Sequence, residues 1–303
     1  MSTTELRLGV VGLDGHGPVF IEQLNGPDCP VPGMRVTAAM PVPSVMVSEQ
    51  QLEENVKFVT GRGVRITDNP SELAEQADGI LILHDDGSKH YELAELFAGK
   101  GKPLFVDKPL EASTAKAAEL VALCRKHDCP LFTASSLRFS LEMQAALENG
   151  AGGAVISAMV YSPYMERPTM PGWIYYAIHA VEPLYQLMGT GCREVRCIQS
   201  AYGPVAAGLW QDGRTGIARA VAGGHHGYGF TVWRERMTEV AQVDIDSIYQ
   251  ELLKKIKEFF ATGVSPVAPE ASLEAMAFME AANKSMAGNG KAVSVCLASG
   301  LTG

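Results

Sequence analysis

A lysine stands at the end of an apolar run in segment 104–110, which reads LFVDKPL. The run is typical of a buried strand, and ligands bind outside the carboxyl ends of strands in an open α/β sheet. Lys108 lies there between Asp107 and Pro109, whose ring fixes φ, so it is well placed for chemistry. The alternative is an ordinary surface lysine in a strand-to-helix turn, and this segment alone does not decide between the two.

A histidine with aromatic neighbours lies in segment 174–188, which we expect to be helical. Tyr175 and His179 are four residues apart and so share one face of that helix, and Glu182 is placed to orient the imidazole. A histidine on an apolar helix is more often a satisfied core residue than a catalyst. Nearby polar and aromatic residues favour a concave site instead. The residues expected to bind substrate are Arg138, Tyr161, Trp173, Tyr176 and Glu182.

The first turn of the chain, GLDGHG at 12–17, partly matches the phosphate-binding pattern GxGxxG. Gly12 and Gly17 are in place, but Asp14 stands where glycine normally lets the backbone approach a pyrophosphate. Its carboxylate would face a phosphate unless it caps the helix or pairs with His16. The acid that normally ends the second strand and binds the adenosine ribose is missing, because segment 38–43 reads AAMPVP. No arginine follows closely to favour a 2′-phosphate.

Two further histidines, His84 and His90, flank the turn after the apolar run at 79–83. That turn lies on the same carboxyl edge as Lys108, so a contact with a cofactor is reasonable. A helix cap at Ser88 is the simpler account of the turn.

Strand and helix patterns alternate over residues 1–133 and predict a doubly wound parallel sheet. We expect strands at 6–12, 34–40, 79–83, 102–106 and 131–134, and helices at 15–25, 48–59, 88–99 and 113–127. From 134 to 303 consecutive strand patterns with short turns predict an α+β domain with an open, mainly antiparallel sheet. Its strands are expected at 153–161, 194–202, 205–210, 215–221, 228–236 and 292–296, and its helices at 174–188, 246–261 and 273–287.

Composition excludes several classes of protein. The net charge of −9 argues against non-specific nucleic-acid binding, which needs a basic surface. The apolar run at 80–83 is far too short to span a membrane, and the N-terminus lacks the features of a signal peptide, so we expect a cytoplasmic protein. The six cysteines show no zinc-binding spacing, so we expect no metal site.

With the Asp-Lys-Pro segment and the His179 segment in one chain, the sequence resembles the glucose–fructose oxidoreductase and inositol dehydrogenase family (Gfo/Idh/MocA). Segments 136–139 (SLRF) and 259–266 (FFATGVSP) add to the resemblance, which covers nearly the whole chain. The Leu-Asp pair in the first turn and the Tyr-x-x-x-His-x-x-Glu segment resemble a less characterised branch. The resemblance implies a Rossmann-like dinucleotide-binding domain at 1–133, a substrate-binding and oligomerisation domain at 134–303, and a homo-oligomer such as a dimer or tetramer.

The family also implies NAD or NADP as cofactor and a sugar, polyol or related substrate. Its catalytic lysine and histidine match Lys108 and His179. Many members have an aspartate at the position of Tyr175, which here would relay a proton or hydrogen-bond the substrate instead. The residues expected to contact the cofactor are Gly12, Leu13, Asp14, Gly15, His16, His84, His90, Asp107, Lys108 and Pro109.

Three functions follow, in decreasing order of support. The first is a dehydrogenase that takes hydride from a secondary hydroxyl, with Lys108 lowering the hydroxyl's pKa and His179 accepting its proton. The second retains the cofactor but returns the hydride, as in a sugar lyase or epimerase. The third is a binding protein without catalysis, suggested by Asp14 and by the missing acid after the second strand.

Overall fold

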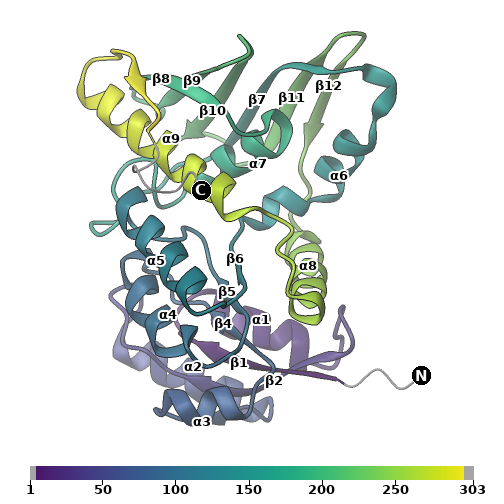
Figure 1. Cartoon of the computed structure of the whole chain (residues 1–303), viewed down its shortest axis with the longest axis vertical. Helices are drawn as coiled ribbons and strands as arrows, with labels where there is room; N and C mark the ends of the chain where they lie inside the picture. The colour runs from purple at the N-terminus through teal and green to yellow at the C-terminus, as the bar shows by residue number, and fades with distance from the viewer. Residues whose placement is uncertain (1–4, 297–303) are drawn as a thin grey trace. The chain divides into compact units, whose positions relative to one another are not determined.

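The computed structural model describes residues 5–296, which form two compact units (Figure 1). The N-terminal unit comprises residues 5–111, 116–133 and 252–269. The C-terminal unit comprises residues 112–115, 134–251 and 270–296. Within the described residues no helix combines the length and apolar content needed to cross a membrane.

The N-terminal unit is built on a parallel sheet with the strand order β3-β2-β1-β4-β5-β6. Its strands are β1 (Leu6–Val11), β2 (Met34–Met40), β3 (Arg65–Ile66), β4 (Gly79–Ile82), β5 (Leu104–Val106) and β6 (Leu131–Phe132). Its helices are α1 (His16–Asn25), α2 (Glu49–Gly61), α3 (Pro70–Glu75), the short η1 (Gly87–Lys89), α4 (His90–Ala98) and α5 (Thr114–Lys126). The chain order reverses between β1 and β4, which is the switch point where such sheets bind ligands.

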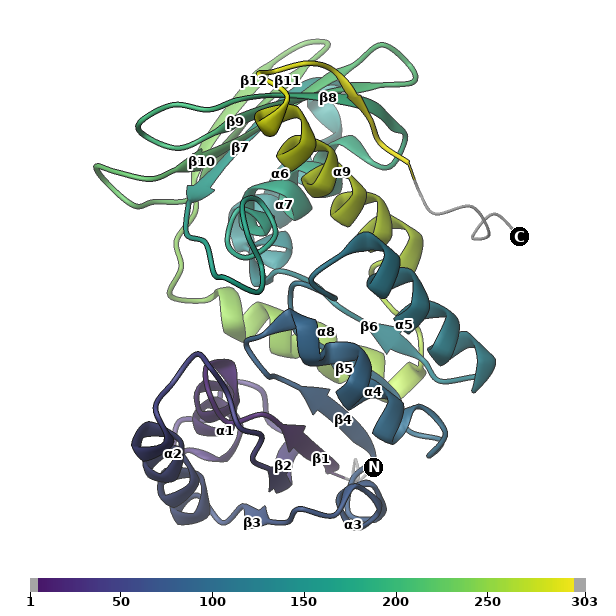
Figure 2. The same cartoon turned by 90° about the vertical axis from the view of Figure 1, so that its left-hand side faces the viewer.

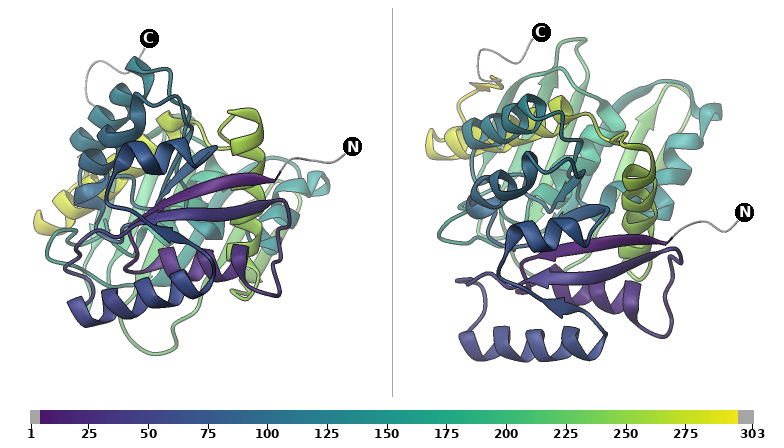
Figure 3. Two further views of the ribbon diagram at one scale, coloured as in Figure 1. Left: turned by 90° about the horizontal axis from the view of Figure 1, so that it is seen from below. Right: turned by 60° about the horizontal axis from the view of Figure 1, so that its bottom comes forward.

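Helices cover both faces of this sheet, so its central strands are buried throughout. All four residues of β4 are buried, as a strand packed on two sides requires. α1 packs against α2 and β2, while α3 and α4 pack against each other, and Figure 3 shows α1 and α2 on the opposite side of the sheet from α4 and α5. The predicted doubly wound fold is confirmed.

A late helix also contributes to the N-terminal unit. The part of α8 (Ile248–Thr262) from residue 252 onwards belongs to it, although the sequence pattern placed everything after residue 133 in the second domain. Phe259 lies with its ring 5.6 Å from that of Phe132, and the Phe260 ring fills the space where Gly79 lacks a side chain. Burial of these two aromatic rings stabilises the packing of the end of α8 against the sheet.

The C-terminal unit contains a seven-stranded sheet of order β12-β11-β7-β10-β9-β8-β13. The strands are β7 (Val155–Pro163), β8 (Cys192–Ile198), β9 (Val205–Trp210), β10 (Thr215–Val221), β11 (Gly229–Arg234), β12 (Thr238–Gln242) and β13 (Val293–Ser294). All strand pairs are antiparallel except β7 with β10, which agrees with the predicted, mainly antiparallel sheet. Gly213 has φ of 87° in the tight β9–β10 hairpin that the Asp-Gly pair predicts.

Helices of this unit cover one face of its sheet (Figure 2). They are α6 (Leu141–Glu148), α7 (Ile178–Met188) and α9 (Pro269–Ala287), preceded by the short helix η2 (Ser136–Phe139). α7 packs on β7 and β10, and ten of its eleven residues are buried, so its side chains are held firmly. This helix carries His179.

Some elements differ from the sequence-based expectation. β3, α3, α6 and β12 were not expected, and α7 begins at Ile178 rather than at 174. Tyr175 therefore precedes the helix, and the helical spacing from Tyr175 to His179 does not apply.

Candidate active site

The first turn brings two glycines, Gly12 and Gly17, into close contact with neighbouring backbone. Gly12 has φ of 92°, and a Cβ there would lie 2.6 Å from the backbone nitrogen of His84. A Cβ on Gly17 would lie 2.3 Å from the carbonyl oxygen of Gly12. Gly15 is the N-cap of α1, and no side chain caps that helix. The helix thus begins with an uncapped N-terminus that favours an anionic group.

The Asp14 carboxylate neither caps α1 nor pairs with His16. Its oxygens accept hydrogen bonds from Ser44 Oγ at 2.6 Å and from the backbone N–H of Asp85 at 3.1 and 3.2 Å. The side chain is buried, and it joins the loop after β2 to the loop after β4. Asp14 therefore links the two loops by hydrogen bonds, which explains how a carboxylate is accommodated in this turn.

His84 and His90 hold the ends of β4 and β5 together. His84 Nε2 lies 3.2 Å from the carbonyl oxygen of Pro43, and His90 bridges the carbonyl oxygens of His84 and Pro109 at 2.7 and 2.9 Å. Both side chains are buried. The cap in this turn is Asp86, which accepts from the N–H of Ser88, rather than Ser88 itself. The bond of His90 to Pro109 fixes the backbone directly after Lys108.

An ion pair joins the first turn to the Asp-Lys-Pro segment. His16 Nδ1 lies 2.6 Å from Asp107 Oδ2, and the Asp107 side chain is only 2% exposed. Burial lowers the pKa of His16, but the Asp107 carboxylate outweighs this and raises it above its usual value. Burial would raise the pKa of Asp107, yet His16 and then Lys108 hold it far below the usual value. Each partner therefore favours the charged form of the other.

A third carboxylate lies beside this pair. Burial raises the pKa of Asp85, and a Cβ on Gly15 would meet its carboxylate oxygens at 2.2 Å. One ligand atom each from His16, Asp85 and Asp107 lies within 4.8 Å of the others, a grouping able to hold a metal ion. His16 and Lys108 supply the positive charge that offsets the carboxylates here.

These features fit a dinucleotide. The turn itself places no side chain over the start of α1, and Asp14 is held in its own hydrogen bonds. The Asp85 carboxylate of the neighbouring loop lies against Gly15 and would have to give way to a phosphate, while His16 and Lys108 supply positive charge beside it. The groups that would hold the pyrophosphate are the backbone N–H groups of residues 12–16.

In the C-terminal unit the imidazole of His179 is held by Ser135, which comes just before η2. The Ser135 Oγ lies 2.7 Å from His179 Nδ1 and also accepts the N–H of Leu137 at 3.3 Å. The Tyr176 ring stands edge-on to the imidazole, with 4.8 Å between ring centroids, and the Tyr176 and Tyr228 hydroxyls are 2.8 Å apart. His179 is thus fixed by a neutral hydrogen bond and by aromatic rings.

Glu182 acts on Ser135 rather than on the imidazole itself. Its Oε2 accepts the backbone N–H of Ser135 at 2.6 Å and Arg138 Nε at 2.9 Å. Arg138 also donates to Gln186 at 2.8 Å, and the Arg138 and Glu182 side chains are 2% and 3% exposed. This buried ion pair holds the loop that carries Ser135.

The other predicted substrate residues lie in the same unit with varying exposure. Trp173 is fully buried, and its N–H donor has no partner among the described residues. Tyr175 is nearly buried, with the Arg167 guanidinium 5.0 Å from its ring centroid. Tyr161 lines a small cavity together with His179 and Tyr228.

Sequence reasoning missed Ser135, Tyr228 and Gln186. Ser135 directly precedes the SLRF segment that supported the family resemblance, so a signal was present one residue away. Tyr228 directly follows the glycine-rich segment 223–227, which by itself predicts only a turn. Nothing in the sequence marks Gln186.

Comparison with known proteins adds to this geometry. Residues 6–135 match the Gfo/Idh/MocA profile, described as an oxidoreductase family with an NAD-binding Rossmann fold. No curated protein matches the sequence. A probable dehydrogenase from Thermotoga maritima has a similar structure, with 22% identity and a TM-score of 0.78, over 96% of this chain and 99% of that one.

Two inositol dehydrogenases have the same fold. The putative myo-inositol dehydrogenase from Sinorhizobium meliloti is 16% identical with a TM-score of 0.81, over 96% of this chain and 100% of that one. The scyllo-inositol dehydrogenase from Lactobacillus casei, solved with NAD(H) and scyllo-inositol, is 14% identical with a TM-score of 0.78, over 96% and 99%. At these identities the likeness establishes the fold.

The N-terminal unit is therefore a nicotinamide-dinucleotide-binding domain of an oxidoreductase. Residues 6–135 are thus similar to the NAD-binding part of the Gfo/Idh/MocA oxidoreductases.

Proposed function

We propose that the protein is an NAD(P)-dependent dehydrogenase that oxidises a secondary hydroxyl of a sugar, polyol or related small molecule. The observation that carries this is the His179 imidazole, held at Nδ1 by Ser135 and flanked by tyrosine hydroxyls, in a chain whose NAD-binding domain presents a buried lysine. The nicotinamide, when bound, accepts the hydride.

Lys108 stabilises the developing alkoxide. Its side chain is 5% exposed at the end of β5, so its ammonium acts in a medium of low dielectric, where a charge is strongly felt. The backbone around it is fixed by the bonds of Asp107 to His16 and of Pro109 to His90. A lysine held in this way lowers the pKa of a substrate hydroxyl and polarises the product carbonyl.

His179 accepts the hydroxyl proton. Ser135 Oγ already accepts the N–H of Leu137, and its second lone pair suits an N–H on His179 Nδ1. This tautomer leaves Nε2 as the basic nitrogen. Polar and aromatic contacts to the substrate come from Tyr161, Tyr175 and Tyr176. The site is supported by buried side chains behind these residues, namely Arg138, Glu182 and Trp173.

Variants at the two proposed catalytic residues test the mechanism. A panel of sugars and polyols is screened by nicotinamide absorbance, and Lys108→Ala and His179→Ala are each expected to lower kcat by about 100-fold or more. Lys126→Ala and His226→Ala, which alter exposed residues of the same types, serve as controls. Unchanged turnover in either catalytic variant would exclude the mechanism.

A lyase or epimerase that returns the hydride is the second candidate. The hydrogen-bonded hydroxyls of Tyr176 and Tyr228 lie beside His179 and offer another proton donor, as elimination or epimerisation requires. Product formation that needs the cofactor but leaves nicotinamide absorbance unchanged would favour it. If the protein neither bound a cofactor nor turned over any substrate, the hypothesis of a binding protein without catalysis would be favoured.

We further propose a homo-oligomer formed through the open face of the second sheet. Ile217 of β10, Met159 of β7, Thr231 of β11 and Val240 of β12 stand in one row on the side away from α7, and all four are at least partly exposed. A mainly apolar row of this kind is typical of an interface. Light scattering of the purified protein measures the oligomeric state.

The cysteines agree with a reducing compartment such as the cytoplasm. All six are free, and four of them are buried.

A further inference from the structure

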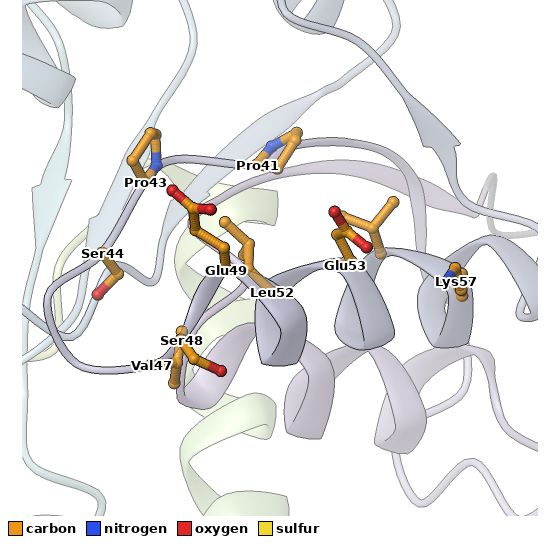
Figure 4. A pocket seen from close by; sticks show the side chains of 10 residues that line it. Pro41, Pro43, Ser44, Val47, Ser48, Glu49, Leu52, Glu53 and Lys57 are labelled. Carbon is orange, nitrogen blue, oxygen red and sulfur yellow. The ribbon is translucent and has the colours of Figure 1, made fainter.

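A pocket of about 550 Å³ opens in the N-terminal unit beside α2 (Figure 4). One wall is the loop after β2, with Pro41, Pro43 and Val47, and the other is the face of α2 that carries Leu52 and Val56. Its volume suits a nucleoside-sized ligand. The walls are mainly apolar, as a purine ring needs.

The position of this pocket points to its occupant. It adjoins the carboxyl end of β2, where sheets of this kind bind the adenosine ribose and normally read it with an acid. Here β2 ends at Met40 and is followed by Pro41, so that acid is missing. Two carboxylates reach the same place from α2 instead: Glu49 and Glu53 are four residues apart and share the helix face toward the prolines (Figure 4).

We propose that this pocket binds the adenosine half of the cofactor and that Glu49 and Glu53 select NAD over NADP. The inference rests on the proposed function and adds to it the choice of dinucleotide. The carboxylates accept hydrogen bonds from the ribose hydroxyls, whereas a 2′-phosphate would bring about two negative charges against two more.

The other polar groups of the pocket do not reverse this charge balance. Lys57 is its only cation among the ten lining residues, and it follows Glu53 by four residues on the same helix face. No arginine lines the pocket in the described part of the chain. The hydroxyl of Ser44 donates to Asp14, and that of Ser48 caps α2 by accepting from Gln51. The net charge of the lining is therefore negative.

Calorimetric binding of NAD⁺ and NADP⁺ to the full-length protein tests the inference without any need for turnover. The fragments 5′-AMP and 2′,5′-ADP are titrated in parallel, because they probe the adenosine pocket alone. We expect NAD⁺ to bind at least about tenfold more tightly than NADP⁺ at low salt. Glu49→Gln and Glu53→Gln should each reduce this ratio about three- to tenfold, as expected for one charge near a phosphate in water-like surroundings.

Glu54→Gln is the matched control. Glu54 lies on the same helix but outside the pocket, with Gln50 as its partner, so it changes the charge of α2 equally and should leave the ratio unchanged. High salt should reduce the preference in the wild type, because exposed charges are screened. Lys57→Gln should further weaken the binding of 2′,5′-ADP.

The outcomes separate this inference from the proposed function. Equal or tighter binding of NADP⁺, or a ratio that Glu54→Gln alters as much as Glu53→Gln does, would overturn the NAD preference and leave the dehydrogenase intact. Failure of both dinucleotides to bind would overturn both proposals.

Discussion

The residues around Lys108 are held in place by an ion pair, whereas His179 is held by a hydrogen bond to a neutral hydroxyl and by aromatic rings. In the N-terminal unit the imidazole of His16 pairs directly with the buried Asp107, and Asp85 lies beside them. In the C-terminal unit His179 contacts the Ser135 hydroxyl and tyrosine rings. The ion pair of Glu182 with Arg138 acts on the backbone N–H of Ser135.

The difference corresponds to the two tasks. A site that receives a pyrophosphate next to three carboxylates must balance its charges, so protonation of His16 matters there. A proton acceptor must stay neutral before the reaction, and a hydroxyl partner orients the imidazole without fixing a positive charge on it. We therefore expect the N-terminal site to respond to pH and the C-terminal site to respond to small changes in shape.

The largest effect is expected from Glu182→Gln. Loss of this carboxylate leaves the Arg138 guanidinium buried, with Gln186 as its remaining side-chain partner among residues 5–296. Breaking a buried ion pair costs about 3 kcal/mol or more. Urea unfolding measures the free energy. Glu119→Gln, in the exposed pair with Lys116, should cost at most about 0.5 kcal/mol. If the two variants lost equal stability, the buried pair would not be what holds the Ser135 loop.

The next effect is expected from His16→Asn. It removes a charged hydrogen bond from Asp107 and should cost about 2 kcal/mol near pH 6. Because the pKa of His16 is raised in the folded state, its contribution is complete below about pH 6.5 and is lost as pH rises through the higher folded value. Thermal unfolding from pH 5.5 to 9 should show the variant approaching the wild type as pH increases.

Exposed His127 provides the control for this series, since His127→Asn should follow the wild type at every pH. A stability gap for His16→Asn that widened with pH would have the wrong sign and would show that Asp107 is not held by an imidazolium.

The elements around Lys108 could largely be predicted from the sequence, because they follow from local patterns. The apolar runs that form β4 and β5 are short and buried on both faces, and a short continuous apolar run predicts a buried strand. The missed strand β12 alternates between exposed and half-buried residues at the edge of its sheet, so no apolar pattern marks it. Helix α6 was missed for a similar reason, since Leu141 and Leu147 on it are exposed.

Partners of the site residues could not be predicted, because they join distant parts of the chain. Ser135 and Glu182 are 47 residues apart, and His16 and Asp107 are 91 apart. From the sequence, Asp14 could cap the following helix or pair with His16. In the structure it accepts a hydrogen bond from Ser44 in the loop after β2 instead. Residue types suggested which side chains are important, and only the fold determines which atoms meet.

The smallest effect is expected from Ser135→Ala, and it tests the C-terminal half of the comparison. Loss of the hydroxyl frees the imidazole to turn about χ2, and kcat should fall about tenfold, or about 1.4 kcal/mol, while KM changes little. The pH profile of kcat should also shift, because Nδ1 loses its partner, and a purely structural role would not produce that shift. Ser162→Ala, at a buried serine whose hydroxyl donates to Pro163, is the control and should leave both constants unchanged. An equal drop in both variants, or a loss of stability without a shift in the profile, would mean that Ser135 only packs the loop and that the orientation of His179 comes from Tyr176.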